Sequence, residues 1–546
     1  MPPAVVDPFA SCPESMPLAR SAVPPIAERA LFARDRCPSW GLPLLTGILL
    51  ALAFPAHPGH PLAFLFNPAW AWVALLPLFI ALSGAGFKQG FRRGWSAGFL
   101  FNLLALYWVA YTQGGGPAVV AGTFLLAAYL GLYTGLFAAA QSLLLRRWGI
   151  GALFLAPLLW TGQEYLLSLG ELGFTWMLLG HSQAPFTHLI QHAASTGVYG
   201  ISAWVVLVDV LLFALIRVST PLRSRLPALG GLLLAFLLPY LHATSVIPSA
   251  DALRPEIRVA LVQPNLKMEE KWGAGGLERS FAILEELSQQ AAEQRPDLLV
   301  WPETALPCYL RIHPHCRERV AQLVDALQVP LLTGASDYDY ERREPYNAAF
   351  YLQPNRIAMQ RYAKMHLVPF GERTPFRDAI PLLRDIDWTA LTGDLGPAEF
   401  APGTERVLFA HPRTPFAVLI CFESVFPDLV RRSVADGAQL LVNITNDSWF
   451  GDTAGPYQHA QLAVMRAVEN RTAVARCATS GISLFIDPFG RSSGATELFV
   501  PAVAVGGLPV VADSSFYTRH GDLFARIALL VSILILAVAS IRRRAN

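Results

Sequence analysis

The chain has 546 residues, of which 53% are hydrophobic and only 15% are charged, and its formal net charge is +2. Water-soluble domains carry about 25% charged residues, so the composition excludes an ordinary soluble protein of this length. No long basic block interleaved with aromatic residues is present, which argues against nucleic-acid binding. The apolar residues are concentrated in the first half, which indicates a membrane part joined to a soluble part.

Eight apolar segments approach the length that crosses a bilayer, about 20 residues. Seven lie in the first half of the chain and the eighth lies near its end. The predicted spans are residues 42–56, 68–86, 95–111, 118–145, 151–169, 198–216, 226–247 and 523–541. The first could instead be a cleaved signal peptide, because it is short and contains Pro43 and Pro55, but the Pro-rich leader before it is a poor n-region.

The loops between these segments alternate in charge, and Lys and Arg are retained on the cytoplasmic side during insertion. Basic residues flank one set of span ends: Arg34, Arg36, Lys88, Arg92, Arg93, Arg146, Arg147, Arg217, Arg223, Arg225, Arg542, Arg543 and Arg544. The opposite loops, residues 57–67, 112–117 and 170–197, contain no Lys or Arg. Both termini are therefore predicted to be cytoplasmic, and the segment between the last two spans is predicted to lie outside.

Two carboxylic acids fall within predicted spans, Glu164 in the fifth and Asp209 in the sixth. A bare carboxylate in hydrocarbon is costly and usually has a partner or a function. Glu164, near the outer end of its span, fits interfacial solvation and an active-site role equally well. Asp209 is predicted to be a structural hydrogen bonder between helices.

The composition of residues 254–513 is that of a soluble domain. Short β-rich runs are predicted at 257–263, 298–301, 329–335, 348–352, 417–421, 440–445 and 482–486. Helices are predicted at 277–295, 320–327, 427–436 and 456–470. Because these strand runs are apolar throughout, they indicate sheets covered on both faces, hence an α/β layered domain.

Reactive side chains in such sheets collect just past the carboxyl ends of the strands. Glu303 follows one predicted strand, Cys421 ends another, and Lys364 leads into a loop that contains Glu372. A lone cysteine at a strand end is by default a small core residue. A reactive thiol needs a cation to lower its pKa from about 8.5 and a base to take its proton, and Lys364 and Glu303 supply both.

Lys364 also departs from the residue usage of the chain. Only four of the 42 basic residues are lysines, namely Lys88, Lys267, Lys271 and Lys364, so arginine is the ordinary cation here. A compact ammonium fits beside a thiol and a developing oxyanion in a way that a forked guanidinium does not. The alternative is an ordinary surface lysine.

The six cysteines lack the paired spacing of a metal site, and no CxxC occurs, so neither a metal nor a redox dithiol is predicted. Cys308 and Cys316 are close in sequence and would lie in an oxidising compartment under the predicted topology. A disulfide between them therefore stays open.

Three motifs, WPET around Glu303, YAKMHLVPFGE around Lys364 and ICFES around Cys421, together resemble the nitrilase superfamily of carbon–nitrogen hydrolases. With the WFGD at 449–452 and the flanking spans, nearly the whole chain resembles the apolipoprotein N-acyltransferase family of bacterial inner membranes. The resemblance implies eight transmembrane helices plus a four-layer αββα sandwich. The implied division is a cytoplasmic segment (1–40), a seven-helix membrane domain (41–250), a periplasmic catalytic domain (251–513), and a last span with a cytoplasmic tail (514–546).

The resemblance also implies roles for individual residues. Cys421 is then the nucleophile, Glu303 the general base and Lys364 the group that stabilises the oxyanion. Glu372 is implied as a second carboxylate that orients the site. Two further residues, Glu423 and Trp272, match positions that the family needs.

Four aromatic residues complete the predicted site. Phe422 follows the nucleophile where the family commonly has Tyr, so only an aromatic packing role is implied for it. Trp176 lies in an outer loop, residues 173–183, that resembles a family segment near the site. Trp449 and Phe450 fit a substrate entrance and ordinary packing equally well.

The implied reaction is a ping-pong acyl transfer that needs no cofactor. The Cys421 thiolate takes an acyl chain from a membrane phospholipid, and the thioester passes it to the α-amine of a diacylated apolipoprotein. Two rival functions remain open: a membrane-anchored amidase that hydrolyses a small amide, and a transporter or sensor whose outer domain is catalytically dead.

Overall fold

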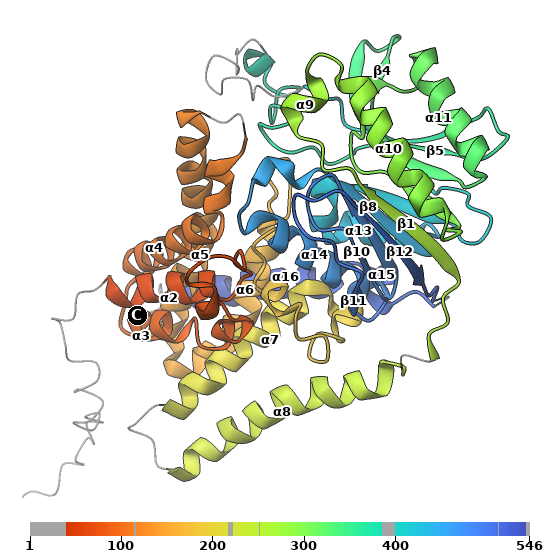
Figure 1. The fold of residues 1–546 in the computed structure, drawn as a ribbon. Coiled ribbons are helices and arrows are strands. Elements are labelled where there is room, and N and C mark those ends of the chain that lie inside the picture. The colour runs from red at the N-terminus through yellow and green to blue at the C-terminus, as the bar shows by residue number, and fades with distance from the viewer. Residues whose placement is uncertain are drawn as a thin grey trace, which may run out of the picture. The chain divides into compact units, whose positions relative to one another are not determined.

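Helices fill the first half of the described chain, and two β-sheets with their covering helices fill most of the second (Figure 1). The computed structural model describes residues 40–113, 116–216, 222–249, 252–384, 399–511 and 513–541. The predicted N-terminal segment and six of the basic residues used for the topology, Arg34, Arg36, Arg217 and Arg542 to Arg544, lie outside the described residues.

Each predicted span falls on helical structure. The helices are α2 (Gly41–Leu52), α3 (Leu76–Leu82), α4 (Phe87–Ala105), α5 (Pro117–Trp148), α6 (Ala156–Leu167), α7 (Ala193–Ile216), α8 (Leu222–Val246) and α16 (Leu523–Ile541). Short 3₁₀ helices lie between them: η1 (Ala63–Leu65), η2 (Pro68–Trp72), η3 (Tyr107–Tyr111), η4 (Ile150–Leu155) and η5 (Leu179–Gln183).

Eight transmembrane helices are not confirmed. Four helices of the described chain are long and apolar enough to cross a membrane: Pro117–Trp148, Ala193–Ile216, Arg225–Val246 and Leu523–Ile541. Helices α2, α3 and α6 have only 12, 7 and 12 residues. Proline explains the short lengths of α3 and α6. Pro77 and Pro157 stand in the first turns of these helices, where a missing backbone N–H is tolerated. Each proline therefore marks a helix start inside a predicted span and divides that span in two.

The two buried acids of the helical half bind backbone N–H groups. Asp209 accepts from Leu75 N at 3.0 Å, which confirms that it joins two helices, α7 and α3. Glu164 accepts from Leu179 N at 2.7 Å and from Trp160 Nε1 at 2.9 Å. Glu164 therefore holds the turn η5, which follows Trp176 in the chain.

Twelve strands of the described residues form two sheets in the second half of the chain. The first sheet has the order β12-β1-β2-β4-β5-β6, with β3 beside β4, and the second has the order β11-β10-β9-β8-β7. The first contains β1 (Ile257–Gln263), β2 (Leu298–Val300), β3 (Leu306–Tyr309), β4 (Leu331–Asp339), β5 (Glu344–Leu352), β6 (Gln360–Ala363) and β12 (Ala502–Leu508). The second contains β7 (Phe416–Ile420), β8 (Leu440–Thr445), β9 (Ala473–Ala478), β10 (Leu484–Ile486) and β11 (Ser492–Ser493).

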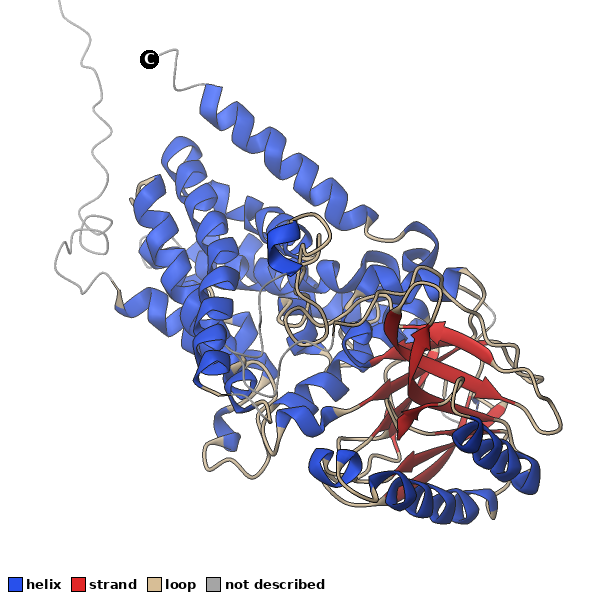
Figure 2. Cartoon of the chain, turned by 90° about the horizontal axis from the view of Figure 1, so that it is seen from above, coloured by secondary structure: helices blue, strands red, loops and turns tan. Residues whose placement is uncertain are grey.

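The sheets and their helices make four layers, as predicted (Figure 2). One apolar cluster joins the two sheets face to face, and includes Val300 and Val442. A second joins the first sheet to α10 (Gly276–Ala292) and α11 (Pro314–Leu327), and a third joins the second sheet to α13 (Pro427–Ala435) and α14 (Gly455–Asn470). Two short helices, α9 (Met268–Trp272) and α15 (Phe516–His520), also lie in the described part of this half.

All seven predicted strand runs coincide with strands, and β1 and β8 have the predicted bounds. Strands β3, β6, β9, β11 and β12 were missed. Strand β12 contains two adjacent glycines, Gly506 and Gly507, which weaken a local strand signal, and it pairs antiparallel with the distant β1. In the second sheet β7, β8 and β9 run parallel, so their carboxyl ends meet at one edge.

Candidate active site

Cys421 begins the 3₁₀ turn η9 (Cys421–Val425), directly after β7. Its φ is +50°, in the left-handed region that non-glycine residues rarely occupy. Its carbonyl oxygen accepts a hydrogen bond from Ser424 Oγ at 2.9 Å. Backbone strain of this kind persists only where surrounding structure imposes it, and it gathers at functional sites.

Glu303 lies in the turn after β2, where it is 6% exposed. Its Oε1 accepts from Asn347 Nδ2 at 2.8 Å, and its Oε2 accepts from Asn446 N at 2.9 Å. Gly334 on β4 makes room for this turn, because a Cβ there would lie 2.7 Å from Glu303 Cα. The carboxylate is therefore held in one orientation by two protein donors.

Lys364 follows β6 and is 1% exposed. Its Nζ lies 2.8 Å from Glu372 Oε2 and 3.5 Å from Glu303 Oε1. Burial by itself lowers the pKa of Lys364, but the carboxylates of Glu372 and Glu303 more than offset burial and hold that pKa well above its ordinary value. The Lys364 ammonium is therefore charged at neutral pH.

The Cys421 thiol is electrostatically coupled to both groups. Burial and the charge of Glu303 raise the pKa of Cys421 well above that of a free thiol, and Lys364 offsets only part of this rise. The resting thiol is therefore protonated. A thiolate forms when Glu303 takes the proton as the sulfur attacks, and Lys364 then faces the new negative charge.

Glu372 and Glu303 are bridged by a residue that sequence reasoning missed. Asn347 Nδ2 donates to Glu372 Oε1 at 2.9 Å and to Glu303 Oε1 at 2.8 Å. Glu372 Oε2 also accepts from Val368 N at 2.8 Å. Asn347 reaches this position because β5 pairs with β6, so that Lys364 N bonds to Asn347 O at 2.9 Å.

Glu423 joins the nucleophile turn to the lysine loop. It is fully buried, and its carboxylate accepts from Ile420 N at 2.8 Å, from Tyr362 Oη at 2.7 Å and from Met365 N at 2.7 Å. Glu423 therefore ties the turn that carries Cys421 to the loop that follows Lys364.

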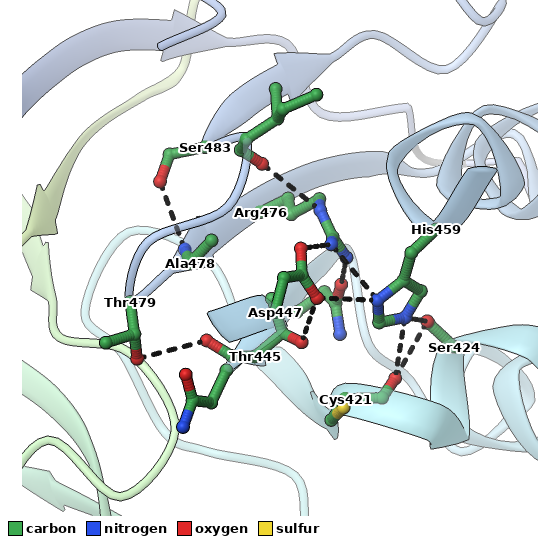
Figure 3. Close-up of polar contacts among 12 residues, drawn as sticks. Cys421, Ser424, Thr445, Asp447, His459, Arg476, Ala478, Thr479 and Ser483 are labelled. Atoms are coloured by element: carbon green, nitrogen blue, oxygen red, sulfur yellow. Dashed lines mark hydrogen bonds and ion pairs between the residues drawn. The ribbon is translucent and has the colours of Figure 1, made fainter. Parts of the chain in front are cut away.

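A second buried group of charges lies behind Cys421 (Figure 3). His459 Nδ1 lies 2.9 Å from Asp447 Oδ1, and Arg476 Nη2 lies 2.6 Å from Asp447 Oδ2. His459 Nε2 lies 3.3 Å from Cys421 O and 3.1 Å from Ser424 Oγ. Ser424, His459 and Asp447 thus form a row like that of a serine hydrolase, but Ser424 is 1% exposed and already bonds the Cys421 carbonyl.

The charges of this second group are well defined. Burial alone would raise the pKa of Asp447, but Arg476 and His459 lower it to about 2. Burial and Arg476 lower the pKa of His459. At neutral pH the group therefore contains an anion, a cation and a neutral imidazole, which contacts the nucleophile turn.

Aromatic side chains surround the site on the side of the helical half. The Trp176 ring lies 5.0 Å from His459, 6.5 Å from Phe422 and 5.9 Å from Phe450, between ring centroids. The indole N–H groups of Trp176 and Trp108 both donate to Gln458 Oε1, each at 3.0 Å. Trp176, predicted near the entrance, is only 2% exposed, so it lies inside this cluster.

The predicted residues do not all converge on the thiol. Trp449 is partly buried, and its carbonyl accepts from Gln113 N at 3.1 Å. Trp272 on α9 is 53% exposed, whereas its neighbour Lys271 is 2% exposed. Cys308 and Cys316 are both buried free thiols, so the structure contains no disulfide between them.

Several of the missed residues carried a usable signal. Asn446 and Asp447 directly follow β8, so the strand-end rule that singled out Glu303 and Cys421 could have found them. His459 lies inside α14 and Arg476 inside β9, where their position in the chain marks neither as a site residue.

Known protein families match both halves of the chain. The model for the Apolipoprotein N-acyltransferase N-terminal domain matches residues 46–211, and the Carbon-nitrogen hydrolase model matches residues 258–505. Among solved structures, Saccharomyces cerevisiae Nit3, a member of branch 10 of the nitrilase superfamily, is 19% identical, with a TM-score of 0.36 over 48% of this chain and 93% of that chain.

Curated relatives span nearly the full length. The Apolipoprotein N-acyltransferase of Geobacter metallireducens is 37% identical over 92% of this chain and 95% of its own length. The Apolipoprotein N-acyltransferase of Chlorobaculum tepidum is 33% identical over 95% of this chain and 99% of its own length. The chain therefore belongs to the apolipoprotein N-acyltransferase family, an enzyme family whose catalytic half has the carbon–nitrogen hydrolase fold.

Proposed function

We propose that this chain moves an acyl chain from a membrane phospholipid, through a thioester on Cys421, to the α-amine of the N-terminal diacylglyceryl-cysteine of an apolipoprotein. The observation that carries the proposal is a strained, strand-end thiol coupled to a buried carboxylate, Glu303, and a buried ammonium, Lys364. The names of the relatives supply the substrate class.

In the first half-reaction, Glu303 takes the Cys421 proton while the sulfur attacks the ester carbonyl carbon. The carbonyl electrons move to oxygen, and Lys364 stabilises that negative charge. The intermediate then collapses, the carbon–oxygen bond of the ester breaks, and Glu303 returns its proton to the departing lysophospholipid. Each positioned proton transfer contributes about 10²–10⁴ in rate.

In the second half-reaction, the acceptor amine attacks the thioester carbonyl and Glu303 takes the amine proton. The carbon–sulfur bond breaks, an amide forms, and the proton on Glu303 returns to the Cys421 thiolate. Glu372 shares Lys364 and Asn347 with Glu303, so it keeps both catalytic groups in place between the two steps.

The helical half explains how a lipid thioester avoids hydrolysis. Thr175 Oγ1 donates to Val425 O at 2.6 Å, and Trp176 packs on the turn beside it, so the loop of the helical half closes the back of the site. Excluding water in this way favours an amine over water as acceptor.

We place the protein in the bacterial inner membrane. The proposed division is residues 1–40 in the cytoplasm, 41–250 in the membrane, 251–513 as a periplasmic catalytic domain, and 514–546 as a last span with a cytoplasmic tail. Four long apolar helices and the charge alternation of the loops support this topology.

The decisive experiment expresses the chain in a bacterium depleted of its own acyltransferase and measures the mass of lipoprotein N-termini. Triacylated N-termini are expected with the natural chain, and free amines are expected with Cys421→Ala at equal membrane abundance. Persistent free amines with the natural chain would overturn the proposal. An amidase, by contrast, would leave no long-chain adduct on Cys421 in the mass spectrum of the purified protein.

A further inference from the structure

Helix α14 carries two adjacent buried polar residues near its start, Gln458 and His459, which contact different parts of the molecule. His459 Nε2 lies 3.3 Å from the Cys421 carbonyl oxygen (Figure 3). Gln458 is 4% exposed, and its side chain makes its hydrogen bonds with the helical half. The start of α14 therefore contacts the nucleophile turn and the helical half at once.

All four hydrogen-bonding positions of the Gln458 amide are occupied. Its Oε1 accepts from Trp108 Nε1 and from Trp176 Nε1, each at 3.0 Å. Its Nε2 donates to Ala105 O at 3.0 Å and to Pro55 O at 3.4 Å. Because an indole N–H only donates and a backbone carbonyl only accepts, these partners fix the orientation of the amide.

The four partners come from separate segments of the helical half. Pro55 follows α2, Ala105 is the last residue of α4, Trp108 lies in η3, and Trp176 lies just before η5. Removing the amide would leave buried polar groups in each segment without a partner, which is costly. Gln458 therefore holds these segments together against α14.

Trp176 is the partner that reaches the active site. Its ring is 2% exposed and lies 5.0 Å from His459 and 6.5 Å from Phe422, between ring centroids. The indole N–H is the polar group of this side chain, and Gln458 is its acceptor. The orientation of the ring beside the nucleophile turn therefore depends on Gln458.

A cavity of about 40 Å³ lies between the helical half and the start of α14. Gln458 lines it together with Pro55 and Tyr107, whereas Trp176 and His459 do not. A water molecule needs about 10–15 Å³ of such space, so the cavity is large enough for water. Gln458, which also binds Trp176, thus forms the wall of this cavity on the side of the indole.

We propose that Gln458 is a positioning residue for the second half-reaction, which keeps water from the thioester by holding Trp176 in place beside the Cys421 turn. The inference rests on the Cys421 thioester proposed above. In the competing reaction, water attacks the thioester carbonyl and the carbon–sulfur bond breaks. The products are a fatty acid, which gains the water oxygen, and the Cys421 thiol, which regains its proton from the water.

The test measures how long an acyl group stays on Cys421 in water. The full-length protein in detergent micelles is acylated with the p-nitrophenyl ester of palmitic acid, and excess ester is removed. The adduct on Cys421 is then followed by intact mass, without any amine acceptor. Gln458→Met keeps the length of the side chain but removes its hydrogen bonds, so its thioester should hydrolyse about tenfold faster than that of the natural chain.

The decay rate separates positioning from a loss of folded protein. A variant that is only less stable would start with less adduct, but the adduct on its folded fraction would decay at the rate of the natural chain. Gln461→Met is the matched control, because Gln461 lies one turn further along α14 and donates to His181 O at 3.1 Å. Its adduct should decay at the rate of the natural chain.

Trp176→Phe tests whether the effect passes through the indole. It keeps an aromatic ring but removes the N–H that Gln458 accepts, so it should also hasten hydrolysis, and it carries the test if Gln458→Met does not accumulate in membranes. Adding Gln458→Met to Trp176→Phe should hasten hydrolysis by less than Gln458→Met does alone.

Three results would overturn the inference. They are a Gln458→Met adduct that decays no faster than that of the natural chain, an equal acceleration in Gln461→Met, and full additivity of the two substitutions at Gln458 and Trp176. The activated ester requires neither a phospholipid donor nor an apolipoprotein acceptor. Failure of the natural chain to triacylate lipoproteins would therefore be a separate result, which contradicts the proposed function alone.

Discussion

The two sides of Cys421 differ in how their buried charged groups are paired. On one side, which we name the carboxylate side, Glu303 and Glu372 share Lys364. On the other, which we name the histidine side and define as Asp447, His459 and Arg476, every member is at most 1% exposed and Asp447 is paired through both oxygens. The charge of the carboxylate side changes when Glu303 takes one proton. On the histidine side, the buried Asp447 carboxylate is already paired with Arg476 and His459.

This difference assigns chemistry to one side and rigidity to the other. Glu303 is the proposed carrier of the proton, and it lies in the turn after β2 with its two oxygens on separate donors, Asn347 and Asn446. The left-handed backbone conformation of Cys421 persists only if surrounding residues hold it in place. Ser424 and His459 do so by contacting the Cys421 carbonyl oxygen. Substitutions on the carboxylate side should therefore lower rate, and those on the histidine side should lower stability.

The largest effect is expected at the nucleophile itself. Cys421→Ser should reduce formation of the acyl-enzyme by at least about 10³-fold, because the hydroxyl is a far weaker nucleophile at neutral pH. The unfolding temperature should not fall, and Cys308→Ala, which lies away from the site, should retain activity. A Cys421→Ser protein that is markedly less stable would break the division between the two sides.

Arg476→Met should be the most destabilising change on the histidine side. It leaves the buried Asp447 carboxylate without its cation, and breaking a buried ion pair costs about 3–5 kcal/mol. The free energy of unfolding, measured by denaturant titration in micelles, should fall by that amount. Unchanged stability together with lost activity would mean that this side takes part in the chemistry.

Glu372→Gln should affect rate more than stability. The amide keeps a group for Asn347 to contact but removes the closest negative charge from Lys364, which then pairs more tightly with Glu303 and weakens it as a base. We expect acylation about 10- to 100-fold slower. Assaying thioester formation by intact mass, with Glu286→Gln as an exposed control, measures this effect.

Asp447 should make the stability of the folded protein depend on pH in the acid range. Its folded pKa of about 2 lies below an unfolded value of about 4, so it contributes about 2–3 kcal/mol that is fully present above pH 4. That contribution is lost as the pH falls from about 4 toward 2. Between about pH 4 and pH 2, the free energy of unfolding should fall more steeply with decreasing pH for the natural chain than for Asp447→Asn. An equal pH dependence of the two proteins would contradict the lowered pKa of Asp447.

The smallest effect is expected at Phe422→Tyr. The Phe422 ring is 6% exposed and packs against Phe426 at 5.0 Å and Trp176 at 6.5 Å between centroids, so a hydroxyl adds little to this cluster. The acylation rate should change by less than about threefold, within about 0.7 kcal/mol. A large gain in the acylation rate of Phe422→Tyr would mean that a hydroxyl at this position assists the residues of the carboxylate side.

Much of the site was predictable because its main residues obey a local rule. Glu303 and Cys421 directly follow apolar strand runs, and the strand-end position is visible in a few consecutive residues. The order of those runs also predicted the layered α/β domain. The spans were predicted less well, since apolar content locates a segment but does not reveal that Pro77 and Pro157 divide it into shorter helices.

The partners of these residues could not be predicted in the same way. Asn347 meets Glu303 across 44 positions of sequence, and Arg476 meets Asp447 across 29. Helix α9 has five residues, little more than one turn, and so shows no periodicity to indicate that Lys271 and not Trp272 faces inward.

By itself, the sequence determined the apolar segments, the layered domain, and the three residues proposed to carry the chemistry, because each depends on patterns within a few residues. Only the tertiary structure decided how Glu303 is oriented, what supports the Cys421 turn, and which charges balance one another. Those features depend on strand pairing and on packing between the two halves, and the electrostatic energy of a buried group is set by neighbours that are distant in the chain.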